Sequence, residues 1–380
     1  MRIFENINYD FLGKRKYFYI LSGTLLLLGF INLAIRGLQF GIDFKGGTEI
    51  VLEFQKPINI SNLRTYTDKM GLGNVELKTF GRETGVLVRT EMQEIPGGIF
   101  PRVTSAIEAN INKILPGAPY KKVDSSANSI TYQFANADTA NQVINYLFNT
   151  EGFQAGKVSN ELSNRQMIVR VGISDWIKDN LKQKMPDNAF KVLKEDKVGP
   201  KVGQELKTNA VLAVFFALIV ILIYLGFRFK LIFAVGAVIA LFHDVLITLG
   251  LYALLYNVIP GLNLEINLTI VAAFLTLIGY SNNDTVVVFD RVRETMKLHK
   301  TVDLEKNIND AINKTLSRTI LTGTTTLLAV FVLLIFGGEV LRSFAFTLFF
   351  GIIIGTYSSI FVASSLVLEY SKKMKGKLEF

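Results

Sequence analysis

Six long apolar runs divide the chain, and polar or basic stretches separate them. Each run is close to the ~20 residues that an α-helix needs to cross a hydrocarbon core of ~30 Å. We therefore predict six membrane-spanning helices, one at 17–36, three within 209–289 and two within 319–369. The first run is too long for the core of a signal peptide, and no small-residue cleavage site follows it, so we expect a retained anchor. The apolar cores of the runs are Tyr17–Ile35, Asn209–Phe227, Leu231–Tyr256, Ile266–Phe289, Thr319–Phe336 and Phe344–Leu368.

The polar segment 37–208 alternates between strand-like and helix-like patterns. Short stretches rich in β-branched and apolar residues predict strands, and apolar positions three or four apart predict helices. This alternation favours an α/β domain, ferredoxin-like with an extension. Asp138 and Ser174 are the expected N-caps of two of its helices. The expected strands are 48–54, 85–90, 129–135, 165–171 and 190–196, and the expected helices are 101–115, 138–148 and 174–185.

Basic residues gather on one side of the predicted membrane. They fill the short flanks and loops on that side, whereas the opposite short connections hold only Arg342. Because short loops rich in Lys and Arg stay in the cytoplasm, we expect both termini, 1–16 and 370–380, to be cytoplasmic. Segment 37–208 then lies outside the inner membrane. The formal net charge of +9 is mostly a signal of this topology and argues against a nucleic-acid partner.

The cytoplasmic loop 290–318 contains a second kind of helical pattern. Leu304, Ile308, Ile312 and Leu316 recur every four residues, and Asp303 could cap the start. We expect an amphipathic helix lying at the membrane surface. A connector packed on the helix ends and a partner-binding helix are equally compatible with this pattern.

Composition narrows the possible chemistry. Half of the 380 residues are hydrophobic and only 19% are charged, which favours a membrane protein over a soluble one. The chain has no cysteine and two histidines, which makes thiolate catalysis, disulfides and a His- or Cys-built metal site improbable. No phosphate-binding loop motif is present either. We therefore expect neither a catalytic constellation nor a metal or cofactor.

Polar residues inside three predicted spans are the candidate functional residues. Asp284 follows Asn283 in the fourth run, six residues before its expected end, which places it about 9 Å inside the membrane at 1.5 Å per residue. Arg318 begins a stripe of threonines at the start of the fifth run, and His243 and Asp244 lie in the third. A buried charge costs roughly 2.5–3.5 kcal/mol by insertion scales, so each needs a partner or water. A shared hydrated interior in which Asp284 pairs with Arg318 would satisfy them.

A structural role is the alternative for each of these residues. Arg318 could extend to the aqueous interface, and a carboxylate near a helix end can be solvated. For Asp244 beside His243, structural and proton-coupling roles are equally supported by the pattern. Glycine motifs at the two junctions with segment 37–208 are explained by tight turns alone. These motifs contain Asp43, Gly46 and Gly47 in the first and Gly199 and Gly203 in the second.

Taken together, the motifs resemble those of the SecF family, the smaller partners in SecD/SecF complexes of bacterial protein export. The resemblance covers all six runs in order, and the fourth-run motif is highly specific. The expected insertion at about 119–185 in the external domain is a departure from the family pattern. The matching stretches are "FGIDFKGGT", "VGPKVGQEL", "FHDVLITLG", "GYSNNDTVVVFDRVRE", "INKTLSRTILTGTTTLLAV" and "GIIIGTYSSIFVASSL".

The resemblance implies half of a proton-driven transporter of the RND superfamily. It implies a SecD-like sister subunit, the SecYEG translocon channel, a translocating preprotein and membrane lipid as partners, and use of the proton motive force late in export. Asp284 and Arg318 match the family's proposed proton-relay residues. Two alternatives are an RND-type exporter of small molecules or lipids and a membrane-bound enzyme or receptor. The first is disfavoured because one six-helix chain is half the usual exporter size.

Overall fold

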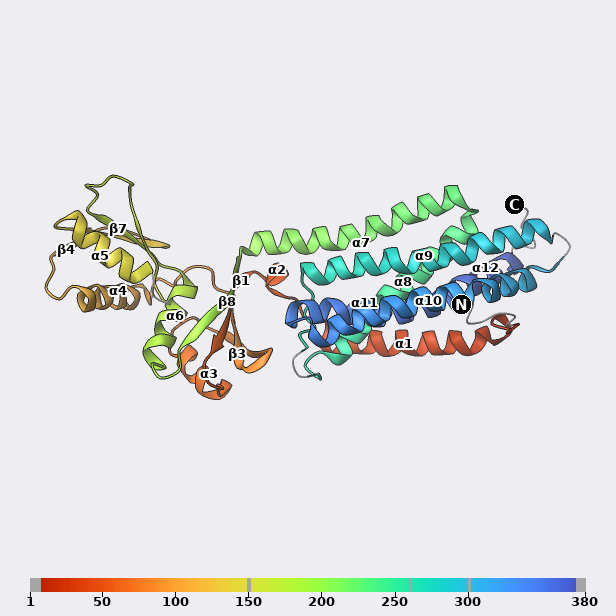
Figure 1. Ribbon diagram of the computed structural model, residues 1–380, viewed down its shortest axis with the longest axis horizontal. Coiled ribbons are helices and arrows are strands. Elements are labelled where there is room, and N and C mark those ends of the chain that lie inside the picture. Colours follow the sequence, from red (N-terminus) through yellow and green to blue (C-terminus); the bar gives the residue numbers. More distant parts are fainter. Residues whose placement is uncertain (1–7, 149–151, 260–261, 300–301, 374–380) are drawn as a thin grey trace. The chain divides into compact units, whose positions relative to one another are not determined.

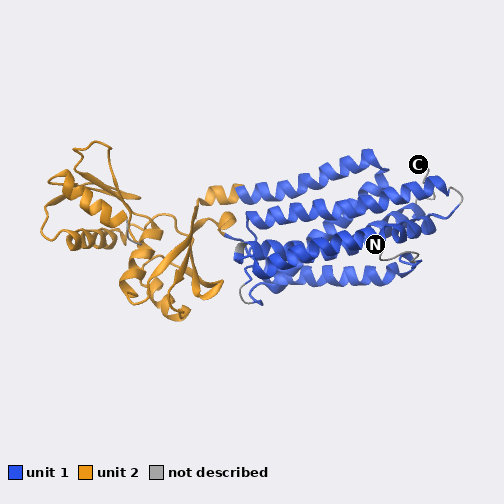
Figure 2. Cartoon of the chain, in the orientation of Figure 1, with its two compact units in different colours: residues 1–41, 206–380 blue, residues 42–205 orange. Residues whose placement is uncertain are grey.

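A computed structural model of the chain describes residues 8–148, 152–259, 262–299 and 302–373. The chain divides into two compact units, shown in different colours in Figure 2. Unit 1 contains residues 1–41 and 206–380, and unit 2 contains residues 42–205. Most of the expected tail 370–380 and the first half of the expected N-terminal segment 1–16 lie outside the described residues.

Unit 1 is a bundle of long helices (Figure 1). Five helical segments of the described chain are long and apolar enough to cross a membrane. The fourth predicted span also forms a helix, α9, but a run of polar residues around Asp284 lowers its mean hydropathy. The helices are α1 (Arg15–Arg36), α7 (Pro200–Arg228), α8 (Leu231–Leu255), α9 (Leu268–Leu298), α10 (Leu304–Phe336), α11 (Glu339–Ser358) and α12 (Ser364–Lys373), with the short 3-10 helix η1 (Leu12–Lys14) before α1.

Helices α8 and α11 form the centre of the bundle. Helix α8 contacts α1, α9 and α11, and α11 also contacts α10. Glycines permit the closest of these approaches: a Cβ added at Gly250 of α8 would lie 2.7 Å from the Cα of Gly29 in α1. Tight contact through small residues is the usual way in which helices pack where no water drives association.

The amphipathic segment after residue 303 is not a separate surface helix. It forms the first turns of α10, a single helix of 33 residues that continues into the fifth predicted span. Asp303 caps it as expected, since its side chain accepts a hydrogen bond from the Glu305 backbone N–H. The segment can continue the helix because Ile308 and Ile312 are buried against the end of the bundle. Packing on neighbouring helices therefore takes the place of the expected packing on lipid.

Unit 2 contains two antiparallel four-stranded sheets, with strand orders β2-β3-β1-β8 and β4-β5-β7-β6. Helices α3 and α6 contact each other and belong to the first sheet, whereas α4 contacts α5 beside the second (Figure 1). The elements are α2 (Ile42–Lys45), β1 (Gly47–Phe54), α3 (Ile60–Asp68), β2 (Val75–Phe80), β3 (Arg82–Thr90), α4 (Phe100–Ile114), β4 (Tyr120–Ser126), β5 (Ser129–Phe134), α5 (Ala137–Phe148), β6 (Ala155–Lys157), β7 (Gln166–Arg170), α6 (Ile173–Lys184) and β8 (Phe190–Val198).

One apolar core runs through both halves of unit 2. Apolar positions along α4, such as Val103 and Ile107, are fully buried in it, as their helical spacing predicts. Trp176 of α6 lies in the same core, and its indole N–H donates to the Met70 carbonyl at 3.1 Å. The expected strands and helices of this segment are all present. Helix α3 and strands β2, β4 and β6 were not predicted.

Both expected N-caps in unit 2 are wrong. Asn136 caps α5 instead of Asp138, because its side-chain oxygen accepts from the Thr139 backbone N–H at 2.8 Å. Helix α6 begins after Gly172, and Ser174 lies inside its first turn. The Ser174 hydroxyl instead donates to Glu195 at 2.5 Å, which ties α6 to β8.

Candidate functional site

Asp244 of α8 is the most completely enclosed carboxylate of the bundle, at 1% exposure. Its Oδ2 accepts hydrogen bonds from the hydroxyls of Ser281 in α9, at 2.7 Å, and Ser358 in α11, at 2.8 Å. Its Oδ1 lies 3.0 Å from Nδ1 of His243. Three helices thus meet at one carboxylate. Gly355 leaves room for Ser281, since a Cβ there would lie 2.9 Å from the Ser281 hydroxyl oxygen.

His243 extends this network to α1. Its Nε2 lies 2.9 Å from the hydroxyl oxygen of Ser22, which in turn lies 2.7 Å from the hydroxyl oxygen of Tyr357. The Tyr357 hydroxyl also lies within 2.8 Å of the Phe18 carbonyl and donates to it. An unbroken chain of polar groups therefore links α8, α1 and α11 through the apolar interior. Such a chain can hold a charge or pass a proton between groups.

Asp284 lies one helical turn from this network. It is three residues after Ser281 on α9, so the two side chains share a face. Its carboxylate is 5% exposed, and its Oδ2 is buried without a hydrogen-bond partner among the described residues. The next residue, Thr285, meets the hydroxyl of Ser359 at 2.8 Å. A buried carboxylate oxygen that lacks a donor is costly, and such an exception calls for a functional explanation.

Arg318 is exposed, and among the described residues it forms no salt bridge with Asp284. Its guanidinium still acts on Asp284 electrostatically at longer range. Asn283 is also exposed, and it lies about 100° around α9 from the buried Asp284. Thr322 and Thr325 bond to their own helix, as Thr322 does to the Arg318 carbonyl at 2.9 Å. Thr326 also accepts a hydrogen bond from the Tyr280 hydroxyl of α9 at 3.2 Å. The structure therefore brings Asp284 close to the Asp244 network, but it leaves Asn283 and Arg318 on an open face.

A π-helical segment, η2 (Ser359–Ala363), interrupts the last span beside this site. It separates α11 from α12 and begins directly after Ser358, which bonds Asp244. The Ser364 hydroxyl donates to the Ser359 carbonyl at 3.1 Å, five residues back, and so occupies the wider turn. Such single-turn insertions are frequent at functional sites because they redirect side chains without breaking the helix.

The two glycine motifs at the junctions meet each other inside unit 2. Gly46 has φ +75°, and a Cβ there would lie 3.1 Å from the Cα of Pro200. A Cβ at Gly203 would lie 3.2 Å from the backbone N of Gly46. The glycines therefore allow α2 to lie directly on the first turn of α7. Asp43 is half-buried in α2. Gly199 precedes α7, and a Cβ added there would make an ordinary van der Waals contact of 3.7 Å with Cγ2 of Val202.

Several members of the site were not predicted from the sequence. Among them are polar residues of types that occur throughout membrane helices, namely Ser22, Ser281, Ser358 and Tyr357. Their only sequence signal is that each lies within an apolar run, where a hydroxyl must find a partner. The π-helical turn has no sequence signal that we can name.

Comparison with known proteins identifies the family. The pattern described as protein export membrane protein SecD/SecF, C-terminal, matches residues 177–373, and the SecD/SecF GG motif matches residues 31–58. The protein translocase subunit SecF of Rhodothermus marinus is 40% identical over 369 residues, which are 97% of this chain and 95% of the relative. The SecF of Koribacter versatilis is 36% identical over 399 residues, 98% and 94% of the two chains.

The fold of this chain also matches that of a solved structure from the same family. The crystal structure of SecDF, a translocon-associated membrane protein from Thermus thermophilus, is 30% identical with a TM-score of 0.64. The match covers 97% of this chain but only 39% of that one. A second SecDF structure, in a super-membrane-facing form, matches with a TM-score of 0.56. The chain is a multi-pass membrane protein and belongs to the SecD/SecF family of protein export membrane proteins.

Proposed function

We propose that this chain is a SecF-type subunit that uses the proton motive force to assist late steps of preprotein translocation across the cytoplasmic membrane. The names of its full-length relatives support a place in the protein translocase. The observation that carries the proton-coupling part is Asp284, a buried carboxylate with one oxygen lacking a partner among the described residues. An oxygen without a donor can take up a proton without displacing a hydrogen bond.

The proposed topology has six spans, with α9 as the fourth. Helix α9 is 31 residues long, which exceeds the length of a hydrocarbon core, and its polar residues face other helices at Ser281 and Asp284. Both termini are cytoplasmic by the distribution of basic residues. Unit 2 then lies outside the membrane. Its first sheet, with strand order β2-β3-β1-β8 and helices α3 and α6, supports a ferredoxin-like domain that carries the second sheet as an extension.

The coupling step follows from two opposed effects on one carboxyl group. Burial disfavours the charged form of Asp284, whereas the positive charge of Arg318 favours it. A movement of α10 relative to α9 changes the distance from Arg318 to Asp284 but leaves Asp284 buried. Such a movement therefore shifts the carboxyl group between its charged and protonated forms. One charge that crosses the membrane potential supplies about 2.3 kcal/mol per 100 mV. The protein can use that free energy only if the two forms favour different helix arrangements.

The proposed partners are a SecD-like sister subunit, the SecYEG channel and the preprotein itself. The solved SecDF chain is more than twice as long as the part matched here, which supports a separate sister subunit for this chain. The exposed face of α9 and α10 that carries Asn283 and Arg318 is the proposed contact surface. A partner there would remove Arg318 from solvent and strengthen its effect on Asp284.

Replacing Asp284 by Asn tests the proposal. The change removes the titratable group and keeps the shape, so the protein should insert normally while export of a pulse-labelled secreted protein slows. Asp290→Asn is the matched control, because Asp290 is exposed on the same helix and pairs with Arg228 at 3.0 Å. Normal export in Asp284→Asn cells with an intact membrane potential would exclude Asp284 as the coupling residue.

A further inference from the structure

The hydrogen bonds on both sides of His243 limit where the protons of its network can lie. Each hydrogen bond contains one proton, which one of its two partners must supply. A serine or tyrosine hydroxyl supplies one proton, whereas a carbonyl oxygen or an ionised carboxylate supplies none. The number of bonds from His243 toward α1 and toward Asp244 therefore fixes the number of protons that the network holds.

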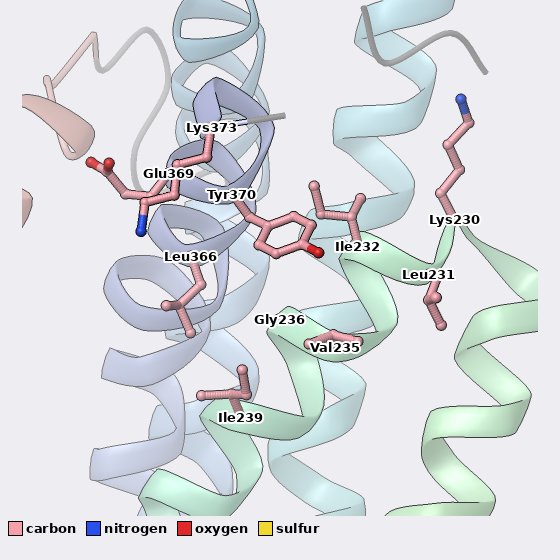
Figure 3. A pocket seen from close by; sticks show the side chains of 10 residues that line it. All are labelled: Lys230, Leu231, Ile232, Val235, Gly236, Ile239, Leu366, Glu369, Tyr370 and Lys373. Atoms are coloured by element: carbon pink, nitrogen blue, oxygen red, sulfur yellow. The ribbon is translucent and has the colours of Figure 1, made fainter. Parts of the chain in front are cut away.

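The network is enclosed within the bundle. A groove of about 480 Å³ opens between α8 and the end of α12, and Ile239 is the last residue of α8 that lines it (Figure 3). The groove thus ends one turn of α8 before His243. The side chains of the network are therefore the donors and acceptors for one another. Its closely buried members, each at most 6% exposed, are Ser22, His243, Asp244, Ser281 and Ser358.

Three contacts in series lie on the α1 side of His243. Its Nε2 lies 2.9 Å from the Ser22 hydroxyl oxygen. That oxygen lies 2.7 Å from the Tyr357 hydroxyl oxygen, and Tyr357 donates to the Phe18 carbonyl at 2.8 Å. The two hydroxyls supply two protons for three bonds, so the third proton belongs to Nε2. With a bare Nε2, one of the three contacts would join two acceptors without a proton, which is costly in a buried site.

The same count applies on the Asp244 side of the ring. Oδ2 of Asp244 accepts from Ser281 and Ser358, and Oδ1 lies 3.0 Å from Nδ1 of His243. In a neutral imidazole that carries its proton on Nε2, Nδ1 is an acceptor. An ionised Asp244 is also an acceptor, so this contact needs one further proton. That proton lies either on Nδ1, beside a carboxylate, or on Oδ1, as part of a carboxylic acid.

We propose that His243 and Asp244 form a second proton-binding site of the bundle, which holds one proton between Nδ1 and Oδ1 while Nε2 keeps its own. In both arrangements the pair has no net charge. Among the described residues, His243 is the one salt-bridge partner of Asp244, which is 1% exposed. A neutral pair accounts for this burial, because a buried net charge is far more costly. The inference does not rest on the coupling role proposed for Asp284.

Nitrogen NMR of the full chain in lipid bilayers tests the count directly. The chain contains two histidines, and His299→Gln removes the exposed one, so ring-nitrogen labelling then reports on His243 alone. We expect a proton on Nε2 at neutral pH. We also expect either a second proton on Nδ1 or an infrared band of a protonated carboxyl group that disappears in Asp244→Asn. A bare Nε2 would overturn the proposal, and so would a bare Nδ1 without the Asp244 carboxyl band.

Two substitutions of Asp244 test whether the proton is needed for the hydrogen bonds. An asparagine reproduces the pattern of a carboxylic acid, because its amide can donate to Nδ1 while its carbonyl oxygen accepts from the two serines. Asp244→Asn should therefore keep the proton on Nε2 and unfold near the wild-type temperature. Asp244→Leu has a similar size but no polar atoms, and it should unfold well below that temperature. Equal losses of stability in the two variants would contradict the proposal.

Asp284→Asn is the matched control, because it removes a buried carboxyl group one turn away on α9. We expect it to leave the signals of both protons unchanged. Disappearance of the second proton in Asp284→Asn would assign that proton to Asp284 and would overturn the proposal. These spectra are recorded without translocation, so their outcome is independent of the export role.

Discussion

Two buried aspartates of the bundle differ in the hydrogen bonds that their surroundings provide. Asp244 receives donors from Ser281 and Ser358 on one oxygen and contacts His243 through the other. Asp284, one turn further along α9, has an oxygen without a donor among the described residues. Asp244 is thus fixed by three polar neighbours, whereas Asp284 keeps an oxygen that can take up a proton without displacing a hydrogen bond. We therefore propose that Asp244 mainly holds α9 in position and that Asp284 carries the coupling.

Arg318→Lys tests whether a permanent, planar cation is needed beside Asp284. A residue that only extends to the interface needs a long stem and a charge, which lysine supplies. A residue that acts on a buried carboxylate also needs fixed donors and a charge that it cannot lose. We expect export to fall by more than about tenfold, equivalent to roughly 1.4 kcal/mol.

Combining Arg318→Lys with Asp284→Asn completes the test. If the two residues act as one unit, the double variant should be no worse than Asp284→Asn alone. Pulse-labelled export measured in all three strains decides this. Defects that simply multiply would return Arg318 to the membrane-interface role.

Asp179 in α6 gives a prediction for the stability of unit 2. It is 5% exposed, and burial raises the pKa of its carboxyl group, against a hydrogen bond from Asn110 that lowers it. The folded state therefore holds a proton at pH values where the unfolded chain has released it, and stability falls as pH rises through that window. Both carboxylate oxygens accept from amide groups, of Asn110 at 3.1 Å and of Gln183 at 2.7 Å, so Asp179→Asn loses one acceptor at every pH. We therefore expect the melting temperature of Asp179→Asn to rise relative to that of the wild type as pH increases from acid to neutral values.

This relative gain should shrink as pH falls toward the ordinary pKa of an aspartate, because the raised pKa lets the folded wild-type carboxyl regain its proton. Thermal unfolding of the solubilised chain across this pH range measures the effect. Asp187→Asn, which alters an aspartate on a turn before β8, is the control. A gain of constant size at every pH would mean that the effect is not due to ionisation.

At the scale of elements, the spacing of apolar residues predicted several helices and strands that bury one face. The period of four in α4 and the β-branched residues of β1, β3, β5 and β7 reflect burial that the structure contains, whereas β2 buries Val75 and Leu77 and was not predicted. Caps and helix ends were harder, because Asn136 outcompetes Asp138 through local geometry alone. The length of α10 could not be predicted, since it depends on packing against other helices. The expected Asp284–Arg318 pair is likewise not formed as a contact within the single chain.

Gly250 and Gly279 are a matched pair for the packing of the bundle. Replacement of either by Ala adds one methyl group and favours the helix by roughly 0.5–1 kcal/mol. At Gly250 that methyl would meet the Gly29 backbone at 2.7 Å, and at Gly279 it would meet nothing within 4 Å. We expect Gly250→Ala to destabilise the chain by about 1–3 kcal/mol despite the helix propensity.

Thermal unfolding of the two variants in detergent measures the difference. Gly279→Ala should unfold at or slightly above the wild-type temperature. If both variants behave alike, the close approach of α1 and α8 is not a determinant of stability.

At the scale of the whole molecule, polar residues lie on an open face of unit 1. Thr325 of α10 is exposed and bonds only to carbonyls of its own helix at 3.0 Å, and Arg318 lies two turns earlier on the same helix. Such a face is costly against lipid. We expect the sister subunit to cover it, and the absence of native cysteine makes single-site labelling straightforward.

A spin label on Thr325→Cys should lose exposure to dissolved oxygen when the sister subunit is added. Val220 on α7 is 62% exposed, and a label on Val220→Cys should keep its exposure. Unchanged exposure at residue 325 in the assembled complex would exclude this face as the contact surface.

The most direct test of proton coupling uses inverted membrane vesicles that contain the translocon, the sister subunit and this chain. Translocation of a preprotein is started, ATP is removed, and an acidic lumen is imposed so that protons move toward the cytoplasmic side. We expect the gradient to speed completion with the wild-type chain and with Asp290→Asn but to have no effect with Asp284→Asn. Equal acceleration with Asp284→Asn would contradict it.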